Sequence, residues 1–252
     1  MTGEPTLSGR KAIVTGGAGH LGSGIALALR DQGCRVVIVD RDPAALARFQ
    51  KETEIETRAC DLSDPVACER TFDGIWQTSG PISILVNAAG RIHSAPLVNI
   101  AGGAERRHSP AAWNEVIDAN LTSVFLATAN VAERMASTRT RGVVINLSSI
   151  AAEGNAGQGA YAAAKAGVNA ATLAWAKELG PLGIRFVAIA LGFIDTPSTH
   201  VALSDDAIKD WARRTPLRRL GKIEHVTSTV LYVIRNDFVT GKVIEVDGGL
   251  TL

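Results

Sequence analysis

The sequence predicts an α/β fold, a doubly wound parallel sheet of about seven strands with helices on both faces. Short runs rich in β-branched residues are continuously apolar, which is typical of strands buried on both faces. Longer stretches with helical periodicity separate these runs, and strand–helix alternation indicates βαβ units. The 252 residues contain no linker, repeat or charge block. We therefore expect residues 1–252 to form a single domain.

The predicted elements follow one another along the chain. The strand runs are residues 11–15, 35–40, a weaker run at 55–59, 84–87, 143–147, 185–190 and 243–246. The helical stretches are residues 22–32, 43–51, 64–78, 110–137, 160–179 and 223–234. Two segments, 91–109 and 195–220, interrupt the alternation. Long irregular segments in such folds usually bind or cover ligands, so we expect an insertion and a substrate lid.

Composition and charge argue against several classes of function. Hydrophobic residues make up 46% of the chain and charged residues 20%, as in ordinary soluble globular proteins. The net charge of +1 gives no bulk attraction to nucleic acid or membrane, so neither is an expected partner. The first ten residues lack the apolar segment of a signal peptide, and no apolar run is long enough to span a membrane. We expect a cytoplasmic protein.

Three cysteines, Cys34, Cys60 and Cys68, lack the spacing of a metal site. Their odd number fits a reducing compartment better than a disulfide framework. The sequence therefore predicts no metal, and it favours buried structural thiols without chemistry at all three positions.

A glycine-rich turn, Thr15-Gly-Gly-Ala-Gly-His-Leu-Gly22, follows the first predicted strand and leads into a helix. Such a turn lets the backbone approach a pyrophosphate, which then lies at the helix N-terminus. The next strand ends in Asp40, 24 residues after Gly16, about the spacing of a ribose-binding carboxylate. This arrangement predicts a dinucleotide-binding domain of Rossmann type.

Asp40 bears on which dinucleotide binds. Its carboxylate would accept hydrogen bonds from the adenosine ribose and repel a 2′-phosphate, which favours NAD over NADP. Arg41 follows directly and offers a phosphate contact instead. The alternative for Asp40 is a helix cap or turn residue, which its place at a strand end in this unit makes less favoured.

Tyr161 and Lys165 lie four residues apart in the predicted helix 160–179. Residues at this spacing share one helix face, so the phenol and the ammonium project together. A nearby cation favours the phenolate and lowers the phenol pKa towards the range useful for acid–base catalysis. Taken alone, the pair also fits an alanine-rich surface helix.

These motifs together resemble the short-chain dehydrogenase/reductase family, in its single-domain branch. The resemblance extends from Gly9 to Gly249. Besides the glycine turn and the Tyr161/Lys165 pair, it rests on Asp61-Leu62, Asn87-Ala-Ala-Gly90, Asn120, Asn146-Leu-Ser-Ser149, Leu191-Gly-Phe-Ile-Asp-Thr196 and Val246-Asp-Gly-Gly249. It implies an NAD(H)-dependent oxidoreductase that interconverts a secondary alcohol and a ketone on a small molecule.

The resemblance also implies roles for the catalytic residues. Tyr161 would be the acid in ketone reduction and the base in alcohol oxidation. Lys165 would lower the pKa of that tyrosine and hold the nicotinamide ribose. Asn120 would hold a water that links Lys165 to solvent, and a serine at the end of the fifth strand would hydrogen-bond the substrate oxygen.

The identity of that serine is open between Ser148 and Ser149. Counting back from Tyr161 at the usual family spacing gives Ser148. Aligning the strand itself gives Ser149, with one residue deleted in the following loop. A register slip reverses every side chain of a strand, whereas a loop deletion is cheap. We therefore expect Ser149 to be the catalytic serine.

Further residues are expected at the cofactor by resemblance. Asp61 and Leu62 would flank the adenine, and Ile194 and Thr196 would contact the nicotinamide carboxamide. The expected cofactor-binding set is Gly16, His20, Leu21, Gly22, Asp40, Arg41, Asp61, Leu62, Asn87, Ala88, Gly90, Tyr161, Lys165, Gly192, Ile194 and Thr196.

The chain departs from the family pattern at two places. His20 replaces the second turn glycine, giving the spacing of the epimerase-like branch, and Leu191 replaces the usual proline. We expect His20 to point into solvent rather than to touch a phosphate. These changes should affect cofactor affinity more than chemistry.

Segment 91–120 is longer than in most family members, and its extra stretch spans residues 98–108. Together with residues 149–152 and 234–241, it is partly similar to type 10 17β-hydroxysteroid dehydrogenases, which oxidise short-chain 3-hydroxyacyl-CoA with NAD. A 3-hydroxyacyl or 3-oxoacyl thioester is therefore the leading substrate. Two sets of residues are open between substrate contact and plain surface or lid roles: Arg106, Arg107 and His108, and Trp211, Arg213 and Arg214.

Other readings remain open. The substrate alternatives are a sugar, polyol, steroid or polyketide. The turn spacing at His20 raises an NAD-dependent epimerase or dehydratase, and folds alone leave a non-catalytic NAD-binding protein. By resemblance we expect a homotetramer or homodimer, formed through helices 110–137 and 160–179 and the last strand.

Overall fold

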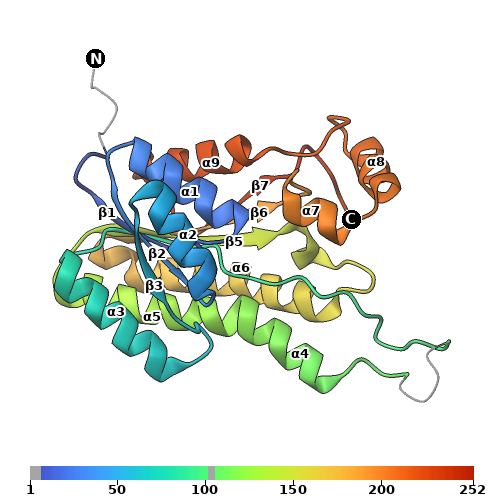
Figure 1. Cartoon of the computed structure of the whole chain (residues 1–252), viewed down its shortest axis with the longest axis horizontal. Helices are drawn as coiled ribbons and strands as arrows, with labels where there is room; N and C mark the ends of the chain where they lie inside the picture. Colours follow the sequence, from blue (N-terminus) through green and yellow to red (C-terminus); the bar gives the residue numbers. More distant parts are fainter. Residues whose placement is uncertain (1–6, 102–105) are drawn as a thin grey trace.

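The computed structural model describes residues 7–101 and 106–252. Its centre is a seven-stranded parallel sheet in the order β3-β2-β1-β4-β5-β6-β7, which confirms the predicted fold class (Figure 1). The strands are β1 Lys11–Thr15, β2 Arg35–Asp40, β3 Glu56–Ala59, β4 Ile84–Asn87, β5 Gly142–Ser149, β6 Ile184–Leu191 and β7 Lys242–Val246. The chain reverses direction across the sheet between β1 and β4, and such a switch point opens a crevice at the carboxyl ends of the strands.

Helices cover both faces of the sheet, and each face has its own core (Figure 1). The helices are α1 His20–Asp31, α2 Pro43–Thr53, α3 Pro65–Ser79, α4 Pro110–Ile117, α5 Ser123–Ser137, α6 Gly159–Leu179, α7 Pro197–Ala202, α8 Asp205–Arg214 and α9 Ile223–Arg235. On one face, α1 and α9 pack Ile25 and Val230 against the strands. On the other, α3 and α5 pack Phe72 and Met135.

Local signals explain where the helices of the first half begin. The side chains of Asp42 and Asp64 each accept hydrogen bonds from two backbone N–H groups of the helix that follows, and a proline occupies the first helical position. An aspartate cap followed by proline is a strong start signal, because proline lacks the N–H that would otherwise go unpaired. These caps place α2 and α3 directly after the strand-end loops that carry Asp40 and Asp61.

The long helix predicted over residues 110–137 is divided. A π-helical turn, Asp118–Thr122, separates α4 from α5, and Asn120 lies at its centre with its side chain buried. Single π-helical turns recur at functional sites. The hydrophobic pattern of the stretch hardly changes across one wide turn, so the periodicity did not reveal it.

The two segments that interrupt the alternation differ from each other. In segment 91–109, Val98 and Arg107 form an antiparallel bridge, and the segment projects from the body of the molecule (Figure 1). Part of the extra stretch 98–108, residues 102–105, lies outside the described residues. The lid segment 195–220 is not irregular as predicted, because it contains α7 and α8. In the described part of the chain, no helix has the length and hydropathy needed to cross a membrane.

Candidate active site

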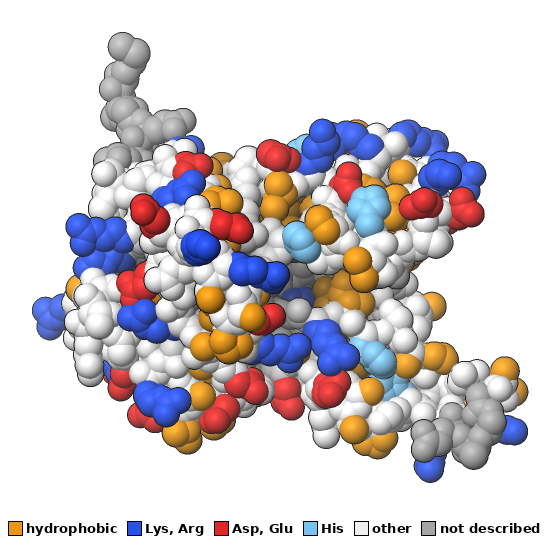
Figure 2. All heavy atoms as spheres, in the orientation of Figure 1, with side chains coloured by type: hydrophobic (Ala, Val, Ile, Leu, Met, Phe, Trp, Pro, Cys, Tyr) orange, Lys and Arg blue, Asp and Glu red, His pale blue; other side chains and the backbone are white. Residues whose placement is uncertain are grey.

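A cleft lies along the carboxyl edge of the sheet, beneath the lid helices. It consists of a cavity of about 520 Å³ and an adjoining one of about 320 Å³, which share the backbone from Ala88 to Arg91 in their walls. We call them the catalytic cavity and the adenosine cavity, after the roles that the sequence predicts for the residues that line them. Figure 2 shows the hollow between the lid and the projecting segment 91–109. Its place at the switch point is where open α/β sheets bind ligands.

The structure brings Tyr161 and Lys165 together on the first turns of α6. Both line the catalytic cavity, and both side chains are buried. The Lys165 Nζ lies 5.6 Å from the centre of the Tyr161 ring and donates a hydrogen bond to the Leu147 carbonyl at 2.9 Å. That bond ties α6 to the end of β5, so the pair is not on an exposed alanine-rich helix face.

Burial dominates the titration of both groups. It raises the pKa of Tyr161 to about 12, opposed by a hydrogen bond with Ser149, and it lowers the pKa of Lys165 to about 8. The expectation that Lys165 lowers the tyrosine pKa is therefore wrong for the protein's own groups. The physical reason is that the apolar surroundings penalise the phenolate and the ammonium alike, and this outweighs their attraction at this distance.

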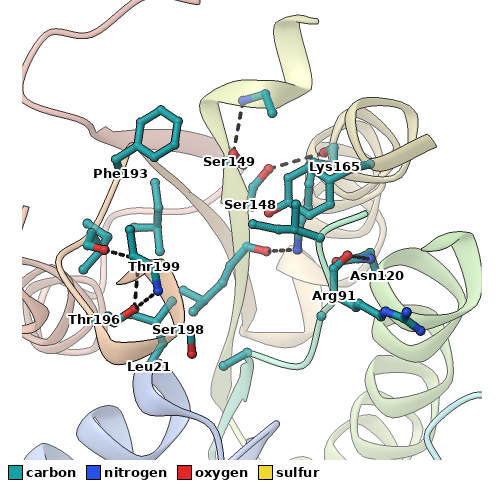
Figure 3. Close-up of a pocket in the computed structure, with 18 of the residues that line it drawn as sticks. Leu21, Arg91, Asn120, Ser148, Ser149, Lys165, Phe193, Thr196, Ser198 and Thr199 are labelled. Carbon is teal, nitrogen blue, oxygen red and sulfur yellow. Dashed lines mark hydrogen bonds between the residues drawn. The ribbon is translucent and has the colours of Figure 1, made fainter. Parts of the chain in front are cut away.

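The two serines at the end of β5 point to different partners (Figure 3). The Ser148 hydroxyl is buried and donates to the Lys165 backbone carbonyl at 3.3 Å. The Ser149 hydroxyl accepts from the Ala151 N–H at 3.1 Å and hydrogen-bonds Tyr161. Successive residues of a strand face opposite sides, so only one of the two can face the phenol. The structure places Ser149 there.

Asn120 lies close to Lys165, and Gly90 makes this possible because it has no side chain. Its Oδ1 accepts from the Arg91 N–H at 3.1 Å, and its Nδ2 donates to the Arg91 carbonyl at 2.8 Å (Figure 3). A Cβ atom at Gly90 would lie 2.6 Å from the Asn120 Oδ1 and 3.6 Å from the Lys165 Nζ. Gly90 thus separates the amide from the ammonium by backbone alone.

The glycine turn is packed too tightly for side chains at two of its positions. A Cβ atom at Gly22 would lie 2.1 Å from the Gly16 carbonyl oxygen, and Gly16 itself has a φ of +62°. The first turn of α1 therefore packs directly on the glycine turn, and residues 19–22 line the catalytic cavity. Backbone this accessible at a helix N-terminus fits the pyrophosphate of a dinucleotide.

His20 does not simply point into solvent as expected. It is exposed, but its Nδ1 lies 2.8 Å from the Ser198 hydroxyl of α7. Both residues line the catalytic cavity, so this contact joins the glycine turn to the lid across the cleft.

The adenosine cavity carries the two carboxylates predicted for it, Asp40 and Asp61, with Arg41 and Leu62. Asp40 Oδ2 accepts from the Ala18 N–H at 3.1 Å, and its Oδ1 accepts from the Asp42 N–H at 3.2 Å. Asp40 therefore also stabilises the turns on either side of it, which is the alternative role that the sequence left open. Hydrogen bonds from the hydroxyl and N–H of Ser63 hold the pKa of Asp61 below its usual value, so this carboxylate is charged.

Asn87 is the predicted cofactor residue that the structure places elsewhere. Its side chain is fully buried and lines neither cavity. Its Nδ2 donates to the Thr128 hydroxyl at 2.9 Å and to the Asn146 Oδ1 at 2.8 Å, and the Asn146 Nδ2 donates to the Thr172 hydroxyl at 2.8 Å. The amide is used up by these bonds, so it ties β4 and β5 to α5 and α6 instead of facing a ligand.

Comparison with known proteins decides the family. The family profile described as "Enoyl-(Acyl carrier protein) reductase" matches residues 16–251. A 3-oxoacyl-(acyl-carrier-protein) reductase FabG of Thermotoga maritima is 35% identical, covering 98% of this chain and 99% of that protein. The chain belongs to the short-chain dehydrogenase/reductase family.

Two further relatives show how wide this family is. Gluconate 5-dehydrogenase of Gluconobacter oxydans is 31% identical, covering 98% of this chain and 96% of that protein. The crystal structure of gox2181 matches with a TM-score of 0.88 at 28% identity, covering 96% of this chain and 95% of that chain. As a member of this family, the protein is an oxidoreductase of alcohol and ketone groups on small molecules, with a nicotinamide cofactor.

Apart from Asn87, every residue that the sequence predicts to be catalytic or to bind the cofactor lines one of the two cavities. In the catalytic cavity these are Gly16, His20, Leu21, Gly22, Ala88, Gly90, Asn120, Ser149, Tyr161, Lys165, Gly192, Ile194 and Thr196. Arg106, Arg107 and His108 line neither cavity. His108 instead lies edge-on to the rings of His93 and Trp113.

Sequence reasoning missed several residues of the catalytic cavity. Phe193 lines it and stacks on Trp211 of α8 with ring centres 4.3 Å apart, and the Arg214 guanidinium lies 4.1 Å from the Trp211 ring. Phe193 lies inside the 191–196 motif, so its position was an available signal. Ser94 and Gln158, which hydrogen-bond each other at 3.1 Å, gave no such signal because they lie in loops far apart in sequence.

The lowered pKa of Lys165 predicts a stability effect. The folded-state pKa of about 8 is below the usual 10.5, so stability from the neutral amine is present above about pH 10.5 and lost as the pH falls through 8. At pH 7 the buried ammonium therefore opposes folding. We expect Lys165→Met to abolish turnover yet stabilise the fold by about 2 kcal/mol at pH 7, after about 1 kcal/mol is lost at the Leu147 carbonyl.

Urea unfolding of wild type and variant measures this effect. The advantage of Lys165→Met should shrink steadily between pH 8 and pH 10. Lys177→Met, on the exposed face of the same helix, is the matched control and should change stability by less than about 0.5 kcal/mol. A Lys165→Met protein that is less stable than wild type at pH 7 would contradict the burial argument.

Proposed function

We propose that the protein is an NAD(H)-dependent oxidoreductase that interconverts a 3-oxoacyl and a 3-hydroxyacyl thioester. The carrying observation is the convergence of Ser149, Tyr161, Lys165 and Asn120 on one cavity that opens into a second cavity containing Asp40. The thioester is supported by similarity to a 3-oxoacyl-(acyl-carrier-protein) reductase over nearly the whole chain. It is also supported by an apolar wall that includes Ile150, Phe193 and Leu203.

In the proposed mechanism the nicotinamide, when bound, supplies or accepts the hydride. The Ser149 hydroxyl donates a hydrogen bond to the substrate oxygen and stabilises its developing negative charge. The Tyr161 phenol then delivers its proton to that oxygen. With a pKa of about 12 the phenol is protonated at neutral pH, which is the form that reduction requires.

Lys165 and Asn120 return a proton to Tyr161 in the proposed mechanism. With a lowered pKa, the Lys165 ammonium gives up a proton readily and restores the phenol after each turnover. The Asn120 Oδ1 and the Lys165 Nζ both lie close to where a Cβ atom of Gly90 would be, so a water held there would connect the ammonium to the open cleft. Oxidation of an alcohol would require the reverse flow and a lower tyrosine pKa.

A second candidate substrate is a hydroxylated acid or sugar. The polar side chains of Ser94, Asn155 and Gln158 line one part of the catalytic cavity and hydrogen-bond in series. Such groups recognise substrate hydroxyls, and one relative is a gluconate 5-dehydrogenase. The first candidate stands ahead because the identity to the thioester reductase is higher.

The function is tested by following NADH oxidation with acetoacetyl-CoA beside a keto-sugar acid and simple ketones. We expect acetoacetyl-CoA to give the highest kcat/KM. Ser149→Ala should lower kcat about 100-fold, since it removes one oxyanion donor, while Ser148→Ala should stay within about tenfold. Firm NADH binding without turnover of any ketone would instead favour an epimerase, a dehydratase or a non-catalytic protein. Full activity in Ser149→Ala would overturn the serine assignment.

Asp40 is proposed to give the preference for NAD over NADP. Its carboxylate lies in the adenosine cavity, where a 2′-phosphate would meet a negative charge. Asp40→Asn keeps the shape but removes the charge. We expect it to shift the ratio of NADPH to NADH dissociation constants about tenfold towards NADPH, the worth of one charge contact. Asp42→Asn, two residues away at the α2 cap, is the control, and an unchanged ratio in Asp40→Asn would refute the role.

We also propose a homo-oligomer, a tetramer or a dimer. Trp113, Phe125 and Leu173, on α4, α5 and α6, are large apolar side chains 38% to 51% exposed, and β7 is an edge strand. Apolar helix faces and open strand edges favour association with another copy. Light scattering should give the mass of a dimer or tetramer, and Phe125→Glu with Leu173→Glu should lower it. A monomeric wild type would contradict the proposal.

A further inference from the structure

Two cysteines meet at the wall of the adenosine cavity. Cys60 follows β3, lines that cavity beside Asp61 and Leu62, and is 6% exposed. Cys68 lies in the first turns of α3 and is fully buried. The Asp61 carbonyl accepts from both thiols, at 3.5 Å from the Cys60 Sγ and 3.9 Å from the Cys68 Sγ. Both thiols thus gather at one carbonyl, and each perturbs the pKa of the other.

Their surroundings divide the roles of the two sulfurs. Hydrogen bonds from Cys68 and Thr71 lower the pKa of Cys60 to about 7 against the effect of burial. The same hydrogen bond and its own burial raise the pKa of Cys68. Cys60 lines the cavity and Cys68 is fully buried behind it, so an oxidant in the cleft meets Cys60 first, and the thiolate of Cys60 is the reactive form.

Cys34 offers an internal comparison. It is also 6% exposed, but it lines neither cavity, and its Sγ donates to the Leu7 carbonyl at 3.5 Å. Burial raises its pKa. Cys34 and Cys60 are equally exposed, but their thiol pKa values shift in opposite directions, so Cys34 is the unreactive reference for Cys60.

We propose that Cys60 and Cys68 form a redox-modification site, which a peroxide oxidises to an intramolecular disulfide that weakens cofactor binding. All three cysteines are free and buried, as the sequence predicts, and the proposed reaction adds chemistry at two of them. Cys60 lies on the cavity wall, so a small oxidant can reach it through the cleft, whereas Cys68 lies behind it in the core.

The chemistry is balanced with one equivalent of peroxide. The Cys60 thiolate attacks one peroxide oxygen, the O–O bond breaks, and hydroxide leaves with the electron pair to give a sulfenic acid. The Cys68 sulfur then attacks the Cys60 sulfur, the S–O bond breaks, and the hydroxyl leaves as water with the Cys68 proton. The hydroxide takes up the proton that Cys60 had released. Two thiols are oxidised, and the peroxide is reduced to two waters.

The disulfide would act on the cofactor through the loop between the two cysteines. A disulfide bond is about 2.05 Å long, far shorter than the contact distance of two unbonded sulfur atoms, so forming it draws residues 60–62 towards α3. This step of the argument rests on the proposed function, in which Asp61 and Leu62 flank the adenine. Bound cofactor would in turn cover Cys60 and slow its oxidation.

The test treats the full-length protein with hydrogen peroxide, in the presence and absence of saturating NADH. Non-reducing peptide mapping should recover one peptide pair linked through Cys60 and Cys68, formed more slowly with NADH. Oxidised protein should bind NADH about tenfold more weakly, the equivalent of one lost charge-assisted contact, and dithiothreitol should restore affinity. Cys34→Ser should respond as wild type does.

Cys68→Ser separates the two halves of the proposal. In this variant peroxide should stop at the Cys60 sulfenic acid, trapped by dimedone, without the affinity loss that dithiothreitol reverses. Absence of the linked peptides, or oxidation of Cys34 as fast as Cys60, would overturn the site. A disulfide that leaves NADH affinity unchanged would overturn its effect on the cofactor. Failure of the reduced wild type to bind NADH would count against the proposed function alone.

Discussion

The buried amide pair Asn87–Asn146 holds the active-site edge of the sheet together. Asn87 ends β4 and pairs in register with Asn146 of the neighbouring strand β5, and both side chains have almost no exposure to water. The Asn87 amide also donates to the Thr128 hydroxyl of α5, and the Asn146 amide donates to the Thr172 hydroxyl of α6. An unsatisfied amide here would be costly, so the network admits only one placement of α6 relative to β5. Tyr161, Lys165 and Ser149 inherit their geometry from that placement.

Burial in the same region explains why the pKa values of the proposed catalytic groups, Tyr161 and Lys165, are shifted. The Lys165 ammonium is buried beside β5, where it donates a hydrogen bond to the Leu147 carbonyl. The pKa of the lysine falls and that of the tyrosine rises, so the cofactor-free pair favours a neutral phenol and a proton-releasing amine. The structure gives up stability at this site for that arrangement, as enzymes commonly do at their active sites.

The cleft also shows how one sheet edge serves several purposes. Asp40 braces the glycine turn and the start of α2 while it lines the adenosine cavity. In the loop at residues 60–63, which lines the same cavity, the Asp61 carbonyl accepts hydrogen bonds from the thiols of Cys60 and Cys68. Across the cleft, His20 contacts Ser198 of the lid. The proposed cofactor site, the thiol pair and helix α7 therefore lie next to one another, although they come from distant parts of the sequence.

Much of the fold was available from the sequence because its signals are local. Apolar runs predicted the seven strands, Asp–Pro pairs fix where α2 and α3 begin, and the glycine turn and Asp40 predicted a dinucleotide crevice. The i, i+4 spacing also placed Tyr161 and Lys165 on one face of a helix. Each of these signals depends on residues a few positions apart, which the backbone geometry of one element brings together.

The tertiary structure decided what depends on distant partners. It turned Asn87 away from the ligand and into the core, because Thr128 and Asn146 take its donors. It set Ser149 rather than Ser148 beside the phenol, and it reversed the expected tyrosine shift, because burial is a property of the whole packing. It also brought Cys60 and Cys68 to one carbonyl. The sequence by itself determined which elements and reactive groups exist, and only long-range packing decided where each group points and how readily it titrates.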